Sequence, residues 1–187
     1  MFFPQSIPEI ILIKPRRFND ARGYFCETYR ESSYREHGVT AAFVQDNHSL
    51  SDAPFVLRGL HFQIGASAQA KLIRCTRGAI FDVAVDLRQG SPTFGAHVTA
   101  ELTEQNGHQL YVPTGFAHGF CTLTANCEVQ YKVSTYYDPA NDRGLAWDDP
   151  SIGIEWPLQG NPPILSGKDT THPLLSDLPA YFQYDGA

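Results

Sequence analysis

Apolar and polar residues alternate along much of this chain, in short runs that glycine and proline interrupt. Residues 81–88 show the pattern best: the apolar positions are Phe81, Val83, Val85 and Leu87, and between them lie Asp82, Ala84, Asp86 and Arg88. A period of two places alternate side chains on opposite faces, as in a β-strand. The Gly-Ser-Pro sequence at residues 90–92 predicts a turn at which this strand ends.

The same pattern predicts further strands at residues 70–78, 97–102, 108–113, 119–124 and 127–137. Only residues 30–38, which end in glycine, indicate a helix, and it would be one or two turns long. Many short strands with almost no helix are typical of a β-sandwich, a jelly roll or a closed barrel. Such a barrel can hold one small ligand in its interior, lined by every second residue of each strand.

The chain of 187 residues shows no repeat, linker or low-complexity segment, so we expect a single domain over residues 1–187. No segment approaches the roughly 18 uninterrupted apolar residues of a membrane span. The apolar run at residues 10–13 is short and basic residues follow it, which argues against a signal peptide. We therefore expect a cytoplasmic protein outside the membrane. Its cysteines lack C-x-x-C spacing and are expected to be buried thiols; they are Cys26, Cys75, Cys121 and Cys127.

The charge balance restricts the partners. The chain has 14 Lys and Arg against 20 Asp and Glu, a net charge of −6. Binding along a nucleic acid needs a concentration of basic residues, so we expect no nucleic-acid partner. A small anionic ligand needs only two or three well-placed cations and is compatible with this composition.

Two polar side chains fall on apolar strand faces. Alternation places Lys71 on the face of Ile73, and Tyr131 on the face of Val129. An unpaired ammonium in an apolar core is costly, so this pattern indicates a polar pocket or a local anion. Taken singly, a snorkelling lysine or a core tyrosine with its hydroxyl at the rim explains each.

The run VLRGLHFQ, residues 56–63, places Arg58 and His61 among apolar residues. Strict alternation would put these two side chains on opposite faces of a strand. Gly59 lies between them and predicts a bulge or bend that lets both reach one site. Without such a site, His61 would be a hydrogen-bonded core histidine.

Residues 107–118, which end at His118, fit the second metal-binding motif of the cupin jelly rolls, G-x5-P-x-G-x2-H. The first cupin motif supplies His-x-His and then an acid, whereas here His61 is followed by Gln63 and by no acid before Asp82. Two histidines without a nearby carboxylate make a poor site for a divalent cation. We therefore expect no metal or other cofactor.

In their order and spacing, the motifs resemble one family, the dTDP-4-dehydrorhamnose 3,5-epimerases. They cover nearly the whole chain and read FNDARGYFCETY, QDNHSLS, VLRGLHFQ, AQAKLIRCTRGAIFDVAVDLRQGSPTFG, YVPTGFAHGF, YKVSTYYDPANDRGLAWDDPSIGIEWP and ILSGKD. The resemblance implies an all-β, cupin-like jelly-roll β-barrel with few short helices. It also implies a metal-free isomerase that inverts C3 and C5 of dTDP-4-keto-6-deoxy-D-glucose, in dTDP-L-rhamnose biosynthesis, and a homodimer with exchanged N-terminal strands.

The resemblance also implies catalytic roles. His61 would be the general base, and Asp169 of the Gly-Lys-Asp motif would fix its tautomer. Tyr131 would be the general acid on the opposite face of the sugar ring. Inversion needs both, because a proton must leave one face and another must arrive on the other. We place Lys71 at the enolate that forms beside the C4 ketone.

Arg58 resembles the family's pyrophosphate ligand, and a guanidinium suits a diphosphate. The other residues that the resemblance assigns to the nucleotide, the phosphates or the sugar are Arg22, Phe25, Glu27, Gln45, Asn47, His118, Tyr137 and Lys168. The segment with Arg22, Phe25 and Glu27 would reach the site of the partner subunit. Asp82 is a candidate partner of Lys71 or His118, and the alternative is a solvated strand face.

Other interpretations stay open from the sequence. Related enzymes invert only C3 or only C5 for antibiotic deoxysugars, and they keep the same catalytic residues. Ketoisomerases related to this family lack the tyrosine, so Tyr131 counts against a ketoisomerase activity. A non-catalytic sugar-nucleotide binding module would need no acid and base on opposite faces. A metal-dependent cupin oxygenase would lose its activity to chelators.

Overall fold

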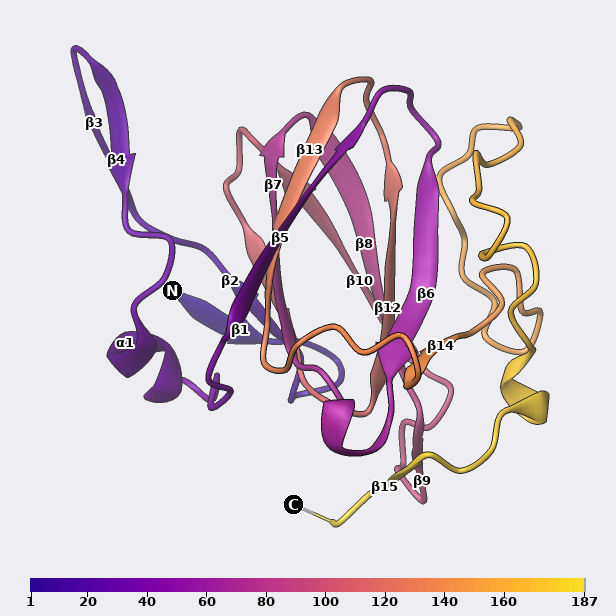
Figure 1. Ribbon diagram of the computed structural model, residues 1–187. Helices are drawn as coiled ribbons and strands as arrows, with labels where there is room; N and C mark the ends of the chain where they lie inside the picture. The colour runs from indigo at the N-terminus through magenta and orange to yellow at the C-terminus, as the bar shows by residue number, and fades with distance from the viewer. Residues whose placement is uncertain (187) are drawn as a thin grey trace.

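Two antiparallel β-sheets face each other and enclose the core of the protein (Figure 1). The computed structural model describes residues 1–186. One sheet has six strands in the order β1 (Phe2–Pro4), β2 (Ile11–Ile13), β11 (Gln109–Val112), β7 (Lys71–Arg77), β13 (Cys127–Val133) and β5 (Gln45–Ser51). The other has five in the order β10 (His97–Thr103), β8 (Ala79–Asp86), β12 (Phe116–Thr122), β6 (Leu57–Gln63) and β14 (Asp142–Gly144).

The remaining elements are short. The strands β3 (Arg17–Asp20) and β4 (Gly23–Cys26) form a hairpin that projects away from the two sheets (Figure 1). The helix α1 is a single short element, Glu31–Arg35, and β9 (Arg88–Gln89) pairs in parallel with β15 (Phe182–Gln183). Two 3₁₀ turns lie at Gly65–Ser67 and Leu175–Asp177. The predicted all-β jelly roll with few short helices is confirmed.

The strand positions largely follow the sequence pattern, with differences at the ends. The strand predicted at residues 119–124 begins earlier, at Phe116, and the one predicted at residues 127–137 ends at Val133. Beyond Val133 the hydroxyl of Ser134 accepts a hydrogen bond from the backbone N–H of Ala70. Within the described residues, no helix is long and apolar enough to cross a membrane.

The space between the sheets is filled by alternate residues of their strands. This inner cluster consists of Ile7, Ile10, Ile73, Cys75, Ile80, Ala84, Val98, Leu102, Leu110, Val112, Phe116, Phe120, Cys127 and Val129, with Tyr131 packed against it. Lys71 shares the inward face of β7 and is 8% exposed. The predicted inward direction of Lys71 and Tyr131 is therefore correct.

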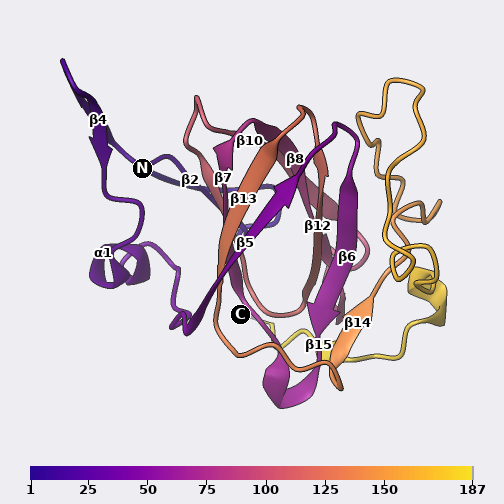
Figure 2. The ribbon, with the colours of Figure 1, turned by 45° about the horizontal axis from the view of Figure 1, so that its top comes forward.

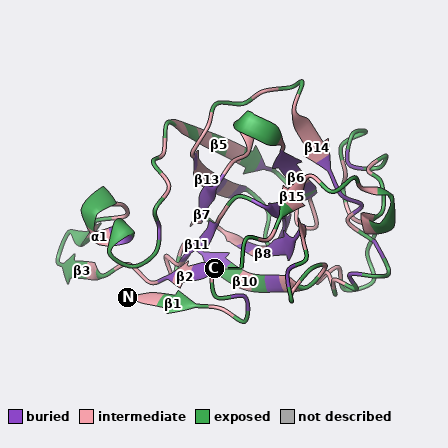
Figure 3. Cartoon of the chain, turned by 90° about the horizontal axis from the view of Figure 1, so that it is seen from below, coloured by how far each residue is buried: buried purple, intermediate pink, exposed green. Residues whose placement is uncertain are grey.

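Strand β8 is buried on both faces, whereas one interpretation of the sequence placed the face of Asp82 in solvent. Its residues Val83 and Val85 pack outward against the C-terminal segment around Leu145 and Ile152. The opposite face, with Asp82, points to the interior, and Asp82 has no exposed surface. The solvated strand face considered for Asp82 is thus wrong. In Figure 3 β7 and β8 are largely purple, whereas α1 is largely green.

Three of the four cysteines, Cys75, Cys121 and Cys127, are buried thiols, as expected. The sulfur atoms of Cys75 and Cys127 lie 3.6 Å apart inside the sheet. Cys26 differs because it ends the projecting hairpin and is only partly buried. All four are free thiols.

Candidate active site

A bulge in β6 brings two side chains to one cavity. Strand β12 pairs with β6 at His118 and His61, and the register then shifts toward Arg58. Gly59 occupies the shift with a φ of +125°, and a Cβ there would lie 2.7 Å from the backbone of β12. Only glycine fits such a close approach at a positive φ. The bulge predicted at Gly59 is confirmed, and Arg58 and His61 line the same cavity.

The cavity lies between the two sheets and contains most of the predicted site. A part of about 410 Å³ is lined by residues that include Arg58, His61, Lys71, His118, Tyr131 and Asp169. A part of about 350 Å³ shares His61, Lys71 and Tyr131 with it and adds Gln45, Asn47, Tyr137, Asp142 and Lys168. The two parts together have the size of a pocket for a small organic ligand.

The candidate base and acid come from opposite walls of this cavity. His61 belongs to β6 of the five-stranded sheet, whereas Tyr131 and Lys71 belong to β13 and β7 of the six-stranded sheet. Figure 2 shows β13 and β5 on one side and β6 on the other. A ring held between the sheets therefore has an imidazole on one side and a phenol on the other.

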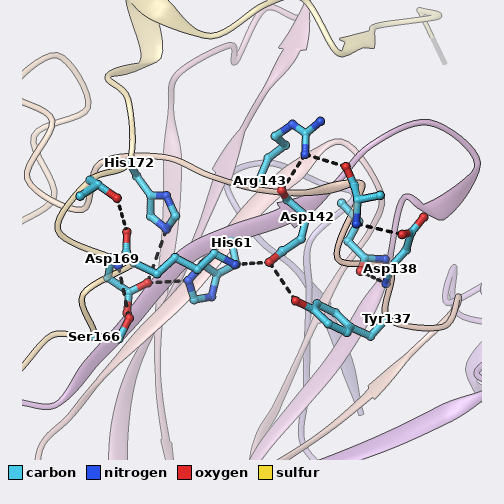
Figure 4. A network of polar contacts seen from close by, with 12 residues as sticks. His61, Tyr137, Asp138, Asp142, Arg143, Ser166, Asp169 and His172 are labelled. Atoms are coloured by element: carbon cyan, nitrogen blue, oxygen red, sulfur yellow. Dashed lines mark hydrogen bonds and ion pairs between the residues drawn. The ribbon is translucent and has the colours of Figure 1, made fainter.

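His61 forms a close pair with Asp169. Its Nε2 lies 2.6 Å from Oδ1 of Asp169, whose Oδ2 accepts a hydrogen bond of 2.7 Å from the Ser166 hydroxyl (Figure 4). Burial would raise the pKa of the Asp169 carboxyl, but His172, His61 and Ser166 around it outweigh that and hold the pKa well below its usual range. Asp169 is therefore an anion throughout the neutral range.

The His61 imidazole is neutral at neutral pH. Burial lowers its pKa below the ordinary 6.5, and the nearby Lys71 adds to this, although Asp169 opposes both. The proton on Nε2 then points at the Asp169 carboxylate. Within residues 1–186, no hydrogen bond reaches Nδ1 of His61, so its lone pair is available to accept a proton.

Lys71 supplies a buried cation with a lowered pKa. Its Nζ donates a hydrogen bond of 3.2 Å to the backbone oxygen of His61. Burial lowers the pKa of Lys71 to about 8, against the attraction of Asp142 and Asp82. The Lys71 side chain is consequently charged in most molecules at pH 7. It loses its proton, and with it the charge, as the pH rises through about 8.

Tyr131 remains a phenol at neutral pH. Burial raises the pKa of its hydroxyl and the negative charge of Asp142 contributes, whereas Arg58 acts in the opposite direction. A protonated phenol in contact with the cavity can donate a proton to a carbanion or enolate carbon.

His118 and Asp82 form a second buried pair. Nε2 of His118 lies 2.9 Å from Oδ1 of Asp82, and both residues are buried. Of the two partners considered for Asp82, the contact is with His118. The other oxygen, Oδ2, has no hydrogen-bond partner among the described residues. This carboxylate also attracts the charge of Lys71.

Asp142 is a site residue that the sequence did not reveal. Its Oδ2 contacts Nζ of Lys168 and lies 3.4 Å from the hydroxyl of Tyr137 (Figure 4). The backbone N–H of Tyr137 donates to Gln45, whose amide donates to Asn47. These contacts join Asp142 to four residues that the sequence did assign. Its position two residues before Gly144, in a segment without clear periodicity, gave no signal.

The family model for dTDP-4-dehydrorhamnose 3,5-epimerase matches residues 4–177. A dTDP-4-dehydrorhamnose 3,5-epimerase of Sinorhizobium fredii is 55% identical over 185 residues, which cover 98% of this chain and 94% of the relative. The chain belongs to this family. The sequence-based prediction of an isomerase from the epimerase family is thereby confirmed.

Two solved structures extend the comparison. The epimerase resembles a dTDP-6-deoxy-D-glucose-3,5-epimerase from Legionella pneumophila, in complex with dTDP-4-keto-L-rhamnose, at a TM-score of 0.95 and 41% identity over 100% of this chain and 99% of that chain. It also resembles a 3′-monoepimerase from Streptomyces bikiniensis, in complex with dTDP-quinovose, at a TM-score of 0.86 and 33% identity. That match covers 92% of this chain and 87% of the other.

Three residues assigned to the nucleotide lie away from the cavity within this chain. Arg22, Phe25 and Glu27 belong to the projecting hairpin or follow it directly. Arg22 pairs with Asp20, Glu27 pairs with Arg30, and Phe25 is 70% exposed. The epimerase chain by itself does not bring them to His61.

His172 is a second residue that the sequence analysis missed. Its Nε2 lies 3.5 Å from Oδ1 of Asp169, and its ring stands nearly perpendicular to that of His61, with ring centroids 5.5 Å apart. The spacing Asp-x-x-His within a turn was the available signal, because residues three apart in a turn lie on one side of it.

One reason for expecting no metal was wrong. The sequence offered no carboxylate near the cupin-type histidines, but the fold brings Asp169 to His61 from 108 residues away. His61, Asp169 and His172 each present a ligand atom within 4.8 Å of the others. His118, the histidine of the second cupin motif, instead contacts Asp82.

Proposed function

We propose that this epimerase inverts C3 and C5 of dTDP-4-keto-6-deoxy-D-glucose to give dTDP-4-keto-L-rhamnose, in dTDP-L-rhamnose biosynthesis. The family and the Legionella structure with its bound dTDP-4-keto-L-rhamnose support this substrate class. The observation that carries the proposal is the position of His61 and Tyr131 on opposite walls of one cavity. Binding alone would not require that arrangement.

His61 acts as the general base. Its free Nδ1 removes the proton at C3 or C5, each of which is adjacent to the C4 ketone. The resulting imidazolium is stabilised by the Asp169 carboxylate at 2.6 Å from Nε2. A general base in this role typically contributes on the order of 10² to 10⁴ in rate.

Lys71 and Tyr131 complete each inversion. When the proton leaves, negative charge develops on the C4 oxygen, and the buried ammonium of Lys71 stabilises the enolate there. Tyr131 then donates its phenolic proton to the opposite face of the same carbon. Because that proton arrives from the other wall, the configuration of the carbon is inverted.

Cations around the cavity hold the diphosphate. The guanidinium of Arg58 is oriented by hydrogen bonds to Ser51 and to the backbone of Leu50, and it borders the cavity. We place the pyrophosphate against Arg58, with Lys168 and His118 nearby, because charge-assisted hydrogen bonds favour phosphate oxygens. Gln45, Asn47 and Tyr137 line the other part of the cavity, beside the sugar nucleotide.

The projecting hairpin serves the second subunit of a homodimer in this proposal. Its aromatic side chains are largely exposed within the chain: Phe18, Tyr24 and Phe25 are 49%, 58% and 70% exposed. Exposed aromatic residues of this kind indicate an interaction surface. We assign Arg22, Phe25 and Glu27 to the nucleotide of the partner's site, through exchange of this N-terminal element.

Subunit complementation tests the exchange. His61→Ala and Phe25→Ala proteins are each made, unfolded together and refolded as a mixture. If the hairpin acts in the partner's site, one site of each mixed dimer carries neither substitution and activity rises above both parents. If the hairpin acts only in its own chain, every site keeps one defect and the mixture stays at the parental rates.

The reaction itself is tested by product analysis. The protein is incubated with dTDP-4-keto-6-deoxy-D-glucose and a downstream 4-ketoreductase, and the trapped sugar is identified by NMR. A dTDP-L-rhamnose product supports the proposal. Inversion at one carbon only would make the protein a single-site epimerase like its Streptomyces neighbour. Tight binding of dTDP without any turnover would instead identify a binding module.

A further inference from the structure

A second histidine lies against the carboxylate of the catalytic pair without a hydrogen bond. The His172 side chain is 7% exposed, and its Nε2 has no hydrogen-bond partner among the described residues. The distance of 3.5 Å to Oδ1 of Asp169 is too long for a normal hydrogen bond. A buried polar atom without a partner is unfavourable, so its direction toward Asp169 calls for an explanation.

The position of His172 is set by the backbone. Asp169 and His172 lie three residues apart in a turn closed by backbone hydrogen bonds at residues 166–171. The imidazole lies directly on Gly144, where a Cβ would come within 2.2 Å of the ring. Gly144 is in turn the strand partner of His61. The second imidazole is thus held beside the first by the pairing of β14 with β6.

We propose that His61, Asp169 and His172 form a binding site for Zn²⁺, and that a bound Zn²⁺ switches off the epimerase. The inhibitory part rests on the proposed function, whereas the binding part does not. Two imidazole nitrogens and one carboxylate oxygen are ligands that Zn²⁺ takes in sites with an open fourth position. Two of the three ligands, His61 and Asp169, also line the cavity.

The contacts of both histidines with Asp169 need little adjustment. Zinc binds nitrogen and oxygen at about 2.0–2.2 Å, so ligand atoms of a tetrahedral site lie about 3.4 Å apart. The His172–Asp169 distance of 3.5 Å already matches this value. The His61–Asp169 pair, at 2.6 Å, would have to open by under about 1 Å. His61 has room for this movement, because its side chain is 32% exposed to the cavity.

Bound zinc would remove the base without changing its charge. In the metal-free pair the proton lies on Nε2 and Nδ1 carries the lone pair that accepts the substrate proton. Zinc on Nε2 displaces the proton from that nitrogen, and in the neutral ring the proton moves to Nδ1. His61 then has no acceptor toward the sugar, and Asp169 is occupied by the metal. Inhibition follows and is reversed when a chelator removes the ion.

The test measures binding and turnover separately. Wild-type protein, freed of metal with EDTA and then of EDTA, is titrated with Zn²⁺ by calorimetry and with Co²⁺ by visible absorption, which reports tetrahedral coordination. The same titrations are made on His172→Gln and on His97→Gln, a matched control on β10 away from the cavity. Turnover is measured at each Zn²⁺ concentration relative to the metal-free rate of the same variant.

The proposal expects one Zn²⁺ per chain in wild-type and His97→Gln, with tetrahedral Co²⁺ absorption. Loss of a ligand in His172→Gln should weaken binding at least about tenfold, the cost of losing even an outer partner of a metal ligand. The Zn²⁺ concentration for half-inhibition should rise by the same factor, and EDTA should restore turnover. If His172→Gln does not fold, as judged by circular dichroism, Asp169→Asn replaces it in the binding titrations.

Equal affinity of wild-type and His172→Gln, or no binding to wild-type, would overturn the site. Zinc that binds at this site and leaves turnover unchanged would overturn the inhibition. A protein without epimerase activity when metal-free would refute the proposed function, while calorimetry and Co²⁺ absorption would still decide the zinc site.

Discussion

Nε2 of His61 and Oδ1 of Asp169 lie 2.6 Å apart, although 108 residues separate them in the chain. The bulge at Gly59 turns His61 toward the cavity, and the turn after Ser166 presents Asp169. With Nε2 directed at an anionic carboxylate, only Nδ1 of His61 can take a substrate proton. In the proposed mechanism, the pair therefore fixes which nitrogen of His61 is the base.

Replacing the carboxylate should slow exchange more than it weakens binding. In Asp169→Asn an amide no longer stabilises the imidazolium, so we expect kcat to fall on the order of 10² to 10⁴. Affinity for dTDP should change little, because Asp169 contacts His61 rather than the phosphates. Steady-state kinetics and calorimetry with dTDP measure the two effects. Ser166→Ala is the matched control and should cost far less, and equal losses would refute the assigned role.

The dependence of kcat/KM on pH should be bell-shaped. The pKa of His61 is below 6.5, so the base is protonated and lost as the pH falls through that lowered value. The pKa of Lys71 is about 8, so its charge is lost as the pH rises through about 8. The phenol of Tyr131 has a raised pKa and stays protonated across this window. A profile that stays flat from pH 7 to 9.5 would contradict the role of Lys71.

Lys71→Met separates the two limbs of that profile. Without the ammonium we expect kcat/KM to fall about 10²- to 10³-fold, as for the loss of one enolate-stabilising donor. The remaining activity should keep its acidic limb, due to His61, and lose the alkaline limb near pH 8. Persistence of the alkaline limb in this variant would assign it to another group.

Gly59 should tolerate no side chain. In Gly59→Ala the new methyl group would lie 2.7 Å from a backbone atom of β12, at a φ of +125°. We expect a loss of about 3 kcal/mol or more in the free energy of unfolding. For a domain of this size the melting temperature should fall by on the order of 10 °C. Gly167→Ala, where nothing lies within 4 Å, is the control and should melt within about 2 °C of wild-type.

Arg58→Lys should act on binding. A lysine loses the bidentate geometry and the hydrogen bonds that orient Arg58. We expect KM to rise roughly 10- to 100-fold with kcat nearly unchanged, because the diphosphate is held equally in the ground and transition states. Arg77→Lys, an exposed residue at the end of β7, is the matched control. A fall in kcat at constant KM would contradict the assignment to the diphosphate.

Strand alternation was sufficient to place Lys71 and Tyr131, because each lies within a regular strand whose inward face is otherwise apolar. Asp82 was ambiguous, since β8 is covered on its outer side by a C-terminal segment that has no periodicity. Asp142 and His172 were missed for a related reason. Their contacts depend on how residues 134–172 return across β6, and no local pattern in the sequence predicts that course of the chain.

The most direct test of the central claim is deuterium incorporation by wild-type and Tyr131→Phe proteins in D₂O, followed at C3 and C5 of dTDP-4-keto-6-deoxy-D-glucose by NMR and mass spectrometry. If His61 removes protons from one face and Tyr131 returns them to the other, wild-type should label both carbons with inversion. Tyr131→Phe should still exchange protons but lose net inversion, because His61 is intact. Undiminished inversion by Tyr131→Phe would contradict the account of an acid and a base on opposite walls.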